Sequence, residues 1–219
     1  YRMRTKSGAY IWLETLVKPI LGADGQITHL QTTSRDVSDR VKIEQQLRQD
    51  ALHDALTHLP NRHLLINRLD AALKQVKQRP AFQFAVLFLD FDHFKVINDS
   101  LGHLVGDQLL ITIASRLLNF VDQSDLVARI GGDEFVILLE QIDGLYQAIR
   151  IAEQILEDLQ NPLIFGGREV FISASIGIVA GSESHSQADD LLRDADIAMY
   201  QAKAKGRASY AIFDPAMHL

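Results

Sequence analysis

Residues 126–139 read Leu-Val-Ala-Arg-Ile-Gly-Gly-Asp-Glu-Phe-Val-Ile-Leu-Leu, with two apolar runs on either side of Gly131-Gly132. The acids Asp133 and Glu134 follow the glycines directly. Because glycine accepts the positive φ angles of tight turns, the pattern predicts a β-hairpin with both acids at its turn. In isolation, such a stretch is more often an ordinary turn with solvated carboxylates.

A second acidic stretch changes this interpretation. Residues 85–95 read Ala-Val-Leu-Phe-Leu-Asp-Phe-Asp-His-Phe-Lys, so an apolar strand leads into Asp90, and a helix-compatible segment with Asn98 follows. A hard cation such as Mg²⁺ takes oxygen ligands and shares its coordination with substrate phosphates. Asp90 and the acidic hairpin therefore predict a divalent-cation site, provided that the fold brings them together.

Composition limits the class of protein. The 219 residues are 47% hydrophobic and 23% charged, which is typical of a globular chain of one domain, or of one domain with a fragment of another. The net charge of −6 argues against broad attachment to nucleic acid or to a membrane surface, so we expect neither partner for this chain. No apolar run reaches the ~20 residues that span a bilayer, which makes a cytoplasmic location the default expectation. The absence of cysteine excludes thiolate metal sites.

Apolar periodicity predicts the order of helices and strands. We expect helices over residues 62–78, 93–101, 105–121, 145–160 and 187–205, and strands over 82–89, 126–139 and 208–213. A further hairpin is expected from residues 163–165 through Gly166-Gly167 to 170–174, and it continues as a strand over 175–181. Helices that interleave with hairpins favour an α+β fold, with a central, mostly antiparallel sheet flanked by helices.

The N-terminal part is predicted to be separate from this sheet. Residues 1–36 alternate as strands do, with a turn at Asp24-Gly25, and form a small β segment. Residues 37–53 are polar with helical periodicity, and Ser38 is the expected N-cap. This linker helix could act as a lever that packs against a second copy, or it could be a solvated connector.

Residues 52 to 214 resemble the GGDEF family, the diguanylate cyclases that make cyclic di-GMP from GTP. The resemblance rests on both acidic stretches, on residues 54–62 (Asp-Ala-Leu-Thr-His-Leu-Pro-Asn-Arg) and on residues 90–107. His58 stands where the family more often has glycine. The resemblance implies a nucleotidyl-cyclase fold of the ferredoxin-like plait, a cyclase domain over residues 54–214, and condensation of two GTP across a homodimer with release of two pyrophosphates.

Two-metal chemistry would meet the needs of this reaction, which must polarise a 3′-hydroxyl and neutralise charge on phosphates. Asp90 and Asp133 are the expected carboxylate ligands, with the backbone carbonyl of Phe91 and with Glu134 beside them. Two Mg²⁺ (or Mn²⁺) per site are implied, and Asp133 and Glu134 are the candidate catalytic residues, with Asp133 a possible general base. Asp92 could join these ligands, but a structural role is favoured, in orienting Lys95 or in capping the next helix.

The resemblance also assigns residues that bind GTP. Asn98 and Asp107 correspond to the family's guanine-reading positions, although Asn98 alone could be a turn residue. The backbone N–H groups of His93 and Phe94, with the side chain of Lys95, are expected at the phosphates.

Two further basic residues, Lys203 and Arg207, are implied to hold the β- and γ-phosphates from one helical face. The alternative is a basic turn that complements the helix dipole. His93 and His103 have no partner at metal-ligand spacing, so we expect neither to bind metal.

One departure from the family concerns product inhibition. Many members carry an Arg-x-x-Asp pair that binds product, whereas residues 122–125 here read Asp-Gln-Ser-Asp. Asp122 replaces the arginine while Asp125 is retained, and an acid at this position repels phosphate. We therefore predict that the product-inhibition site is absent.

Both ends of the chain resemble parts of other domains. Residues 1–36 resemble the closing strands of a PAS sensor domain, although a hairpin without sensory function remains an alternative. Residues 215–219 resemble the start of a linker to an EAL phosphodiesterase domain, which suggests a PAS–GGDEF–EAL parent protein. Two alternatives to the cyclase are a catalytically silent GTP-binding module that controls an adjacent phosphodiesterase, and a dimerisation scaffold. The intact set of nucleotide-site residues favours the cyclase.

Overall fold

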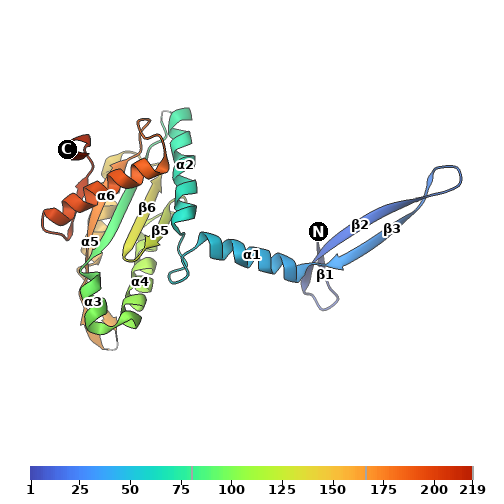
Figure 1. Cartoon of the computed structure of the whole chain (residues 1–219), viewed down its shortest axis with the longest axis horizontal. Helices are drawn as coiled ribbons and strands as arrows, with labels where there is room; N and C mark the ends of the chain where they lie inside the picture. The colour runs from blue at the N-terminus through green and yellow to red at the C-terminus, as the bar shows by residue number, and fades with distance from the viewer. Residues whose placement is uncertain (80, 166, 219) are drawn as a thin grey trace. The chain divides into compact units, whose positions relative to one another are not determined.

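The computed structural model describes residues 1–79, 81–165 and 167–218. The chain forms two compact units, residues 1–51 and residues 52–219 (Figure 1). Leu219, the last residue of the predicted 215–219 linker, lies outside the described residues. In the part of the chain that the structure describes, no helix is both long and apolar enough to cross a lipid bilayer.

The first unit contains a small antiparallel sheet and a helix. Strand β2 (Tyr10–Leu21) pairs with β1 (Arg2–Arg4) and with β3 (Ile27–Asp36). Helix α1 (Ser38–Leu52) follows, with Ile43 and Leu47 exposed on its surface. The predicted strands and helix are present, while the assignment of residues 1–36 to a PAS-like domain stays a prediction.

The start of α1 differs by one position from the expectation. Ser38 is the first helical residue rather than the residue before the helix, and its Oγ accepts a hydrogen bond from Trp12 N at 2.8 Å. The capping oxygen comes instead from Asp36, whose Oδ1 accepts from Ser38 N at 2.9 Å. Hydrogen bonds from the Ser38 side chain and backbone hold the pKa of Asp36 below its usual value. The aspartate therefore satisfies the first free amide of the helix.

The second unit is built on a five-stranded sheet in the order β10-β9-β4-β6-β5. Its strands are β4 (Phe84–Asp92), β5 (Leu126–Gly131), β6 (Glu134–Glu140), β9 (Ser173–Ala180) and β10 (Ser209–Ile212). Strand β10 runs parallel to β9, and the other pairings are antiparallel. A separate short hairpin joins β7 (Leu163–Phe165) to β8 (Arg168–Val170). The predicted α+β fold with a mostly antiparallel sheet is confirmed.

Helices cover both faces of this sheet (Figure 1). On one face lie α2 (Arg62–Gln78) and α6 (Ala188–Ala204), and on the other lie α4 (His103–Leu117) and α5 (Leu145–Asp158). Along β4, Val86 and Phe88 face α2 and α6, whereas Leu87 and Leu89 belong to the core beneath α4 and α5. Because β4 is central and buried on both faces, Asp90, near the end of the strand, lies in the middle of the sheet.

Several element boundaries differ from the sequence-based expectations. Helix α3 (Phe94–Leu101) starts one residue late because His93 adopts a left-handed conformation with φ 60°. Helix α4 begins at His103 and ends at Leu117, and a short 3-10 helix (Leu118–Phe120) completes the stretch expected to be helical. The strand expected to run without a break from Val170 to Gly181 is divided into β8 and β9, and β9 begins at Ser173, so that Ser173 and Ser175 lie in the sheet. Gly166, in the turn expected between residues 163–165 and 170–174, lies outside the described residues.

Helix α6 approaches the sheet most closely at Gly177. A Cβ at this position would overlap the carbonyl oxygen of Ala195 and the backbone nitrogen of Met199, and would lie 3.0 Å from Met199 Cα. Gly177 pairs with Phe88 of β4 and with Ala211 of β10, so this contact sets the height of α6 above the central strands.

Candidate functional site: an acidic turn opposite a strand end

The predicted hairpin forms, and its turn lies against the end of β4. Gly131 and Gly132 have φ angles of 157° and 50°, so glycine permits the tight reversal between β5 and β6. Glu134 is the direct register partner of Asp90. Directly opposed residues in an antiparallel pair point to the same face, here the face covered by α6. Asp133 belongs to the turn itself, so the structure brings all three predicted acids together.

Phe91 is the next residue along β4. Its ring is fully buried and packs edge-on against Phe135, with ring centroids 5.5 Å apart. In the β4–β6 register, the last pair is Asp90 with Glu134, so Phe91 has no β6 residue opposite its backbone. The side chain is thus part of the core, while binding of a metal ion by the backbone carbonyl stays a prediction.

The acids of this site repel one another electrostatically. Burial, and then the charge of Asp90, raise the pKa of Asp133 above its ordinary value. Burial also raises the pKa of Glu134, with further contributions from Asp90, Asp196 and Asp133. The negative charge of the acids in this site therefore exceeds the positive charge of the basic groups beside them.

Asp196 is an acid that the sequence analysis missed. It lies on α6, and burial and the charge of Asp90 raise its pKa even though Lys203 acts to lower it. Its spacing of two helical turns from Lys203 was the available signal, because residues seven apart lie on one face of a helix.

Among the described residues, Lys203 is the basic group that forms an ion pair with Asp90. Its Nζ lies 2.6 Å from Oδ1 of Asp90, so the predicted phosphate-binding lysine and the predicted metal ligand are in direct contact.

The donor set fits a hard divalent cation. Its side-chain donors are carboxylate oxygens with excess negative charge, the ligand type that Mg²⁺ and Mn²⁺ prefer. Among the described residues, no group of three or more Asp, Glu or His side chains converges closely enough to hold an ion by itself. Mg²⁺ characteristically takes only one or two carboxylates and completes its shell with water and substrate phosphates, which matches this arrangement.

Arg129 holds the acidic turn in place through hydrogen bonds. Its Nε and one terminal nitrogen donate to Gly132 O at 3.0 and 2.8 Å, and the other terminal nitrogen donates to Asp54 Oδ1 at 2.8 Å. Burial alone would raise the pKa of Asp54, but hydrogen bonds from Thr57 and Arg129 outweigh it and hold the pKa below normal. Segment 54–62 therefore supports the turn that carries Asp133.

Asp92 has a structural role, although not either of the two expected ones. It is 4% exposed, and it accepts hydrogen bonds from Ser173 Oγ at 2.7 Å, Ser175 Oγ at 2.8 Å and Ala208 N at 3.1 Å. Among the described residues, Asp92 forms no hydrogen bond to Lys95, and no side chain caps the start of α3. Asp92 instead connects β4, β9 and the segment before β10.

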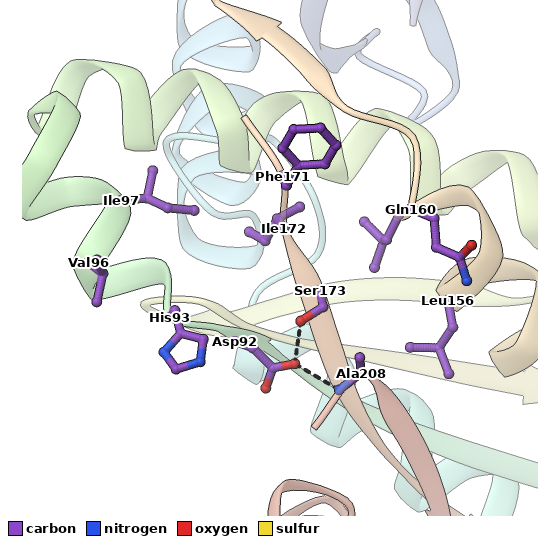
Figure 2. Close-up of a pocket in the computed structure, with 11 residues that line it drawn as sticks. Asp92, His93, Val96, Ile97, Leu156, Gln160, Phe171, Ile172, Ser173 and Ala208 are labelled. Atoms are coloured by element: carbon purple, nitrogen blue, oxygen red, sulfur yellow. Dashed lines mark hydrogen bonds between the residues drawn. The ribbon is translucent and has the colours of Figure 1, made fainter. Parts of the chain in front are cut away.

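Figure 2 shows Asp92 at the edge of a cavity of about 570 Å³. The cavity lies between α3, the end of α5 and the start of β9, and its walls are mainly apolar side chains such as Val96, Leu156 and Phe171. The acids of the turn do not line it. The cavity and the acidic turn are therefore separate features of the surface.

The expectation that Lys203 and Arg207 share one helical face is wrong. Helix α6 ends at Ala204, and Gly206, with φ 125°, turns the chain away from the helix. Arg207 then adopts a left-handed φ of 64°, and its Nε lies 3.9 Å from Asp92 Oδ1. The two basic residues therefore approach different acids, Lys203 at Asp90 and Arg207 at Asp92.

The predicted guanine-reading residues lie on adjacent helices. Asn98 Oδ1 is buried and has no hydrogen-bond partner among the described residues. It lies against Gly106, where a Cβ would overlap it, and Asp107 follows on the exposed side of α4. A buried acceptor without a partner is unusual, which favours a ligand-binding role over a turn role.

Asp125 has a structural role in the turn before β5. Its two carboxylate oxygens accept hydrogen bonds from Asp122 N and Glu140 N, both at 2.9 Å. Asp122 itself is exposed, and because it is an acid it brings no positive charge to this surface.

The fold and the acid cluster define an α+β domain with a candidate divalent-cation site beside a basic residue. A family model described as "Diguanylate cyclase, GGDEF domain" matches residues 51–209. The chain belongs to this family.

Known proteins similar to the chain support this assignment. Diguanylate cyclase TpbB of Pseudomonas aeruginosa is 45% identical over 164 residues, which cover 74% of this chain and 38% of TpbB. The bifunctional diguanylate cyclase/cyclic di-GMP phosphodiesterase MucR of the same species is 42% identical over 186 residues, covering 85% of this chain and 27% of MucR. The chain thus spans well under half the length of either relative.

A solved structure of the TpbB (YfiN) GGDEF domain is also similar. It has a TM-score of 0.73 and 43% identity, and it covers 76% of this chain and 96% of that one. The α+β architecture described above is therefore that of a known GGDEF domain.

Proposed function

We propose that the chain is a diguanylate cyclase that condenses two GTP into cyclic di-GMP and two pyrophosphates. The observation that carries this proposal is the register of Asp90 opposite Glu134, with Asp133 in the adjoining turn and Lys203 at 2.6 Å. This places oxygen donors and a cation at one point of the surface, as the handling of a triphosphate requires. The raised pKa values of Asp133 and Glu134 support it, because crowded acids are typical of functional sites.

The residues of the site have distinct roles in this proposal. Asp90, Asp133, Glu134 and the carbonyl of Phe91 would hold two Mg²⁺ or Mn²⁺ ions. Such ions, when bound, supply neutralisation of phosphate charge and polarisation of a hydroxyl group. Asp133, with a raised pKa, is suited to accept the proton of the attacking 3′-hydroxyl, and Glu134 supports it. Arg129 keeps Asp133 in place through Gly132 O.

Recognition of GTP would use two groups of residues. Asn98 and Asp107 would read the guanine edge, because an amide and a carboxylate together match its donors and acceptor. The amides of His93 and Phe94, at the free start of α3, would bind phosphate together with three side chains, those of Lys95, Lys203 and Arg207. Arg207 would reach the phosphates from beside Asp92 rather than from α6.

One copy would hold one GTP, so the reaction needs a homodimer. The 3′-hydroxyl oxygen of each GTP would attack the α-phosphorus of the other, with a pyrophosphate leaving each time. We infer a cytoplasmic setting, where GTP is available, and a parent protein that carries a PAS-like domain before and an EAL domain after this one. The composition favours neither nucleic acid nor a membrane surface as a partner of this chain.

We further propose that the product-inhibition site is absent. Asp122 brings a negative charge where a phosphate-binding arginine would be needed, and both oxygens of Asp125 are engaged within the fold.

The proposal is tested by incubating the purified chain with GTP and Mg²⁺ and separating the products. We expect cyclic di-GMP and pyrophosphate in a ratio of one to two, and loss of both in Asp133→Ala. Asp143→Ala removes an exposed acid at the start of α5 and should leave activity intact. Saturable GTP binding without product, at protein concentrations that give a dimer, would support the silent regulatory module instead.

A further inference from the structure

The contact between Lys203 and Asp90 has a consequence for cation binding. The two side chains are only 26% and 14% exposed, so water screens this ion pair less than a pair on the surface. Asp90 is also the carboxylate at the centre of the proposed divalent-ion site. The ammonium group of Lys203 therefore already lies against the carboxylate that a metal ion would use.

The backbone of Lys203 is held close to the sheet by the packing of α6. Lys203 follows Met199 by about one helical turn, and Met199 is in backbone contact with β9 at Gly177. Helix α6 is therefore fixed against the sheet just before Lys203. Only the flexible side chain of the lysine is free to swing its ammonium group away from Asp90.

The surrounding charges favour the lysine where it is. Lys203 acts to lower the pKa values of Asp133, Glu134 and Asp196, so its charge is felt by all three acids as well as by its partner. A divalent ion on the same carboxylate would lie within a few ångströms of the ammonium group, and two cations at that distance repel each other strongly.

We propose that Lys203 is the resident counter-ion of Asp90 and competes with a divalent cation for this carboxylate until nucleotide phosphates attract the ammonium group. This inference rests on the proposed function, because it assumes the same metal and triphosphate sites. It predicts weak binding of the metal alone, and mutual strengthening of metal and nucleotide binding. The lysine would thus keep the site electrically balanced when empty and link its loading to GTP.

The first test is a titration with Mn²⁺ in the absence of nucleotide, followed by electron paramagnetic resonance of the free ion. Removal of the competing ammonium in Lys203→Met should tighten Mn²⁺ binding by about tenfold. Lys205→Met removes the same charge two residues away without breaking the pair, and should change the affinity by less than about twofold. Adding Asp90→Asn to Lys203→Met should abolish the gain. The inference is overturned if Lys203→Met binds Mn²⁺ no more tightly than Lys205→Met.

A second measurement needs no variant and remains decisive if Lys203→Met does not fold. Lysine acylation of the wild-type chain, read by peptide mass spectrometry, should modify Lys203 faster when Mn²⁺ is added, with Lys205 as the internal control. An unchanged or slower rate at Lys203 would overturn the inference. Neither test involves product formation, so a chain that makes cyclic di-GMP but fails both tests would refute only this inference, and the converse result would refute only the cyclase.

Discussion

Replacing Gly177 by alanine should displace α6 and thereby separate Lys203 from Asp90. The added methyl group would overlap two backbone atoms, Ala195 O and Met199 N, and no side-chain rotation can remove that overlap. Ordinary contact begins at 3.4 Å, so the helix must retreat by roughly 1–1.5 Å. Such overpacking costs about 2 kcal/mol of unfolding free energy, which corresponds to a loss of about 6 °C in Tm.

The effect on activity should be larger than the effect on stability. A displacement of about 1 Å in a catalytic group can reduce the rate by ~100-fold. We therefore expect Gly177→Ala to remain folded at 25 °C, by circular dichroism, and to lose roughly 100-fold in kcat when pyrophosphate release from GTP is measured.

Gly181→Ala is the matched control for this prediction. A Cβ at Gly181 would overlap the buried ring of Phe84, at the end of β4 away from Asp90, so this variant should be comparably destabilised. Its kcat should stay within about threefold of the wild-type value. The reasoning is refuted if Gly177→Ala keeps full activity, or if Gly181→Ala loses as much.

Four further predictions concern charge, strain and the product. Burial and Asp90 raise the pKa of Asp133 above its unfolded value, so this group stabilises the fold only at low pH, and the contribution disappears as pH rises through the folded pKa. Asp133→Asn should therefore increase the stability of the metal-free chain at pH 7 in urea unfolding and flatten its acid-side pH dependence; a loss of stability would contradict this. A lysine cannot donate to both Asp54 and Gly132 O, so Arg129→Lys should lower the free energy of unfolding by about 2 kcal/mol and lower the cyclase activity. Unchanged activity would show that the acidic turn does not need these hydrogen bonds. His58 has a φ of 58°, so His58→Gly should raise Tm through a gain of about 1 kcal/mol, and a lower Tm would mean that the histidine side chain makes a stabilising contact. Excess cyclic di-GMP should leave the initial rate of the wild-type chain unchanged, and inhibition that disappears in Asp125→Ala would restore the product site.

Much of the second unit could be predicted from the sequence because its local signals agree with its packing. The apolar run of β4 predicted a strand and the glycine turn before Asp133 predicted a hairpin, and the sheet contains both. The acids stand at the ends of these apolar runs, and in the sheet Asp90 is paired with Glu134. This is why the acid cluster was within reach of sequence reasoning.

Long-range side-chain pairs could not be predicted in the same way. The partners of Asp92 come from β9 and from the segment before β10, more than 80 residues away, and no local pattern links them. Arg207 was misplaced because helical spacing was assumed past Gly206, where the backbone has already left the helix. The close approach at Gly177 likewise depends on which helix covers that strand, a property of the tertiary fold alone.

The most direct test of the account is to locate a bound divalent ion. Crystals of the chain grown with Mn²⁺ and a non-hydrolysable GTP analogue should show an anomalous peak in contact with the carboxylates of Asp90 and of Asp133 or Glu134, with Lys203 Nζ moved onto a phosphate oxygen. A nucleotide bound with its Mn²⁺ elsewhere on the surface, and with Lys203 still on Asp90, would contradict the central claim that the acidic turn and the end of β4 form one metal site.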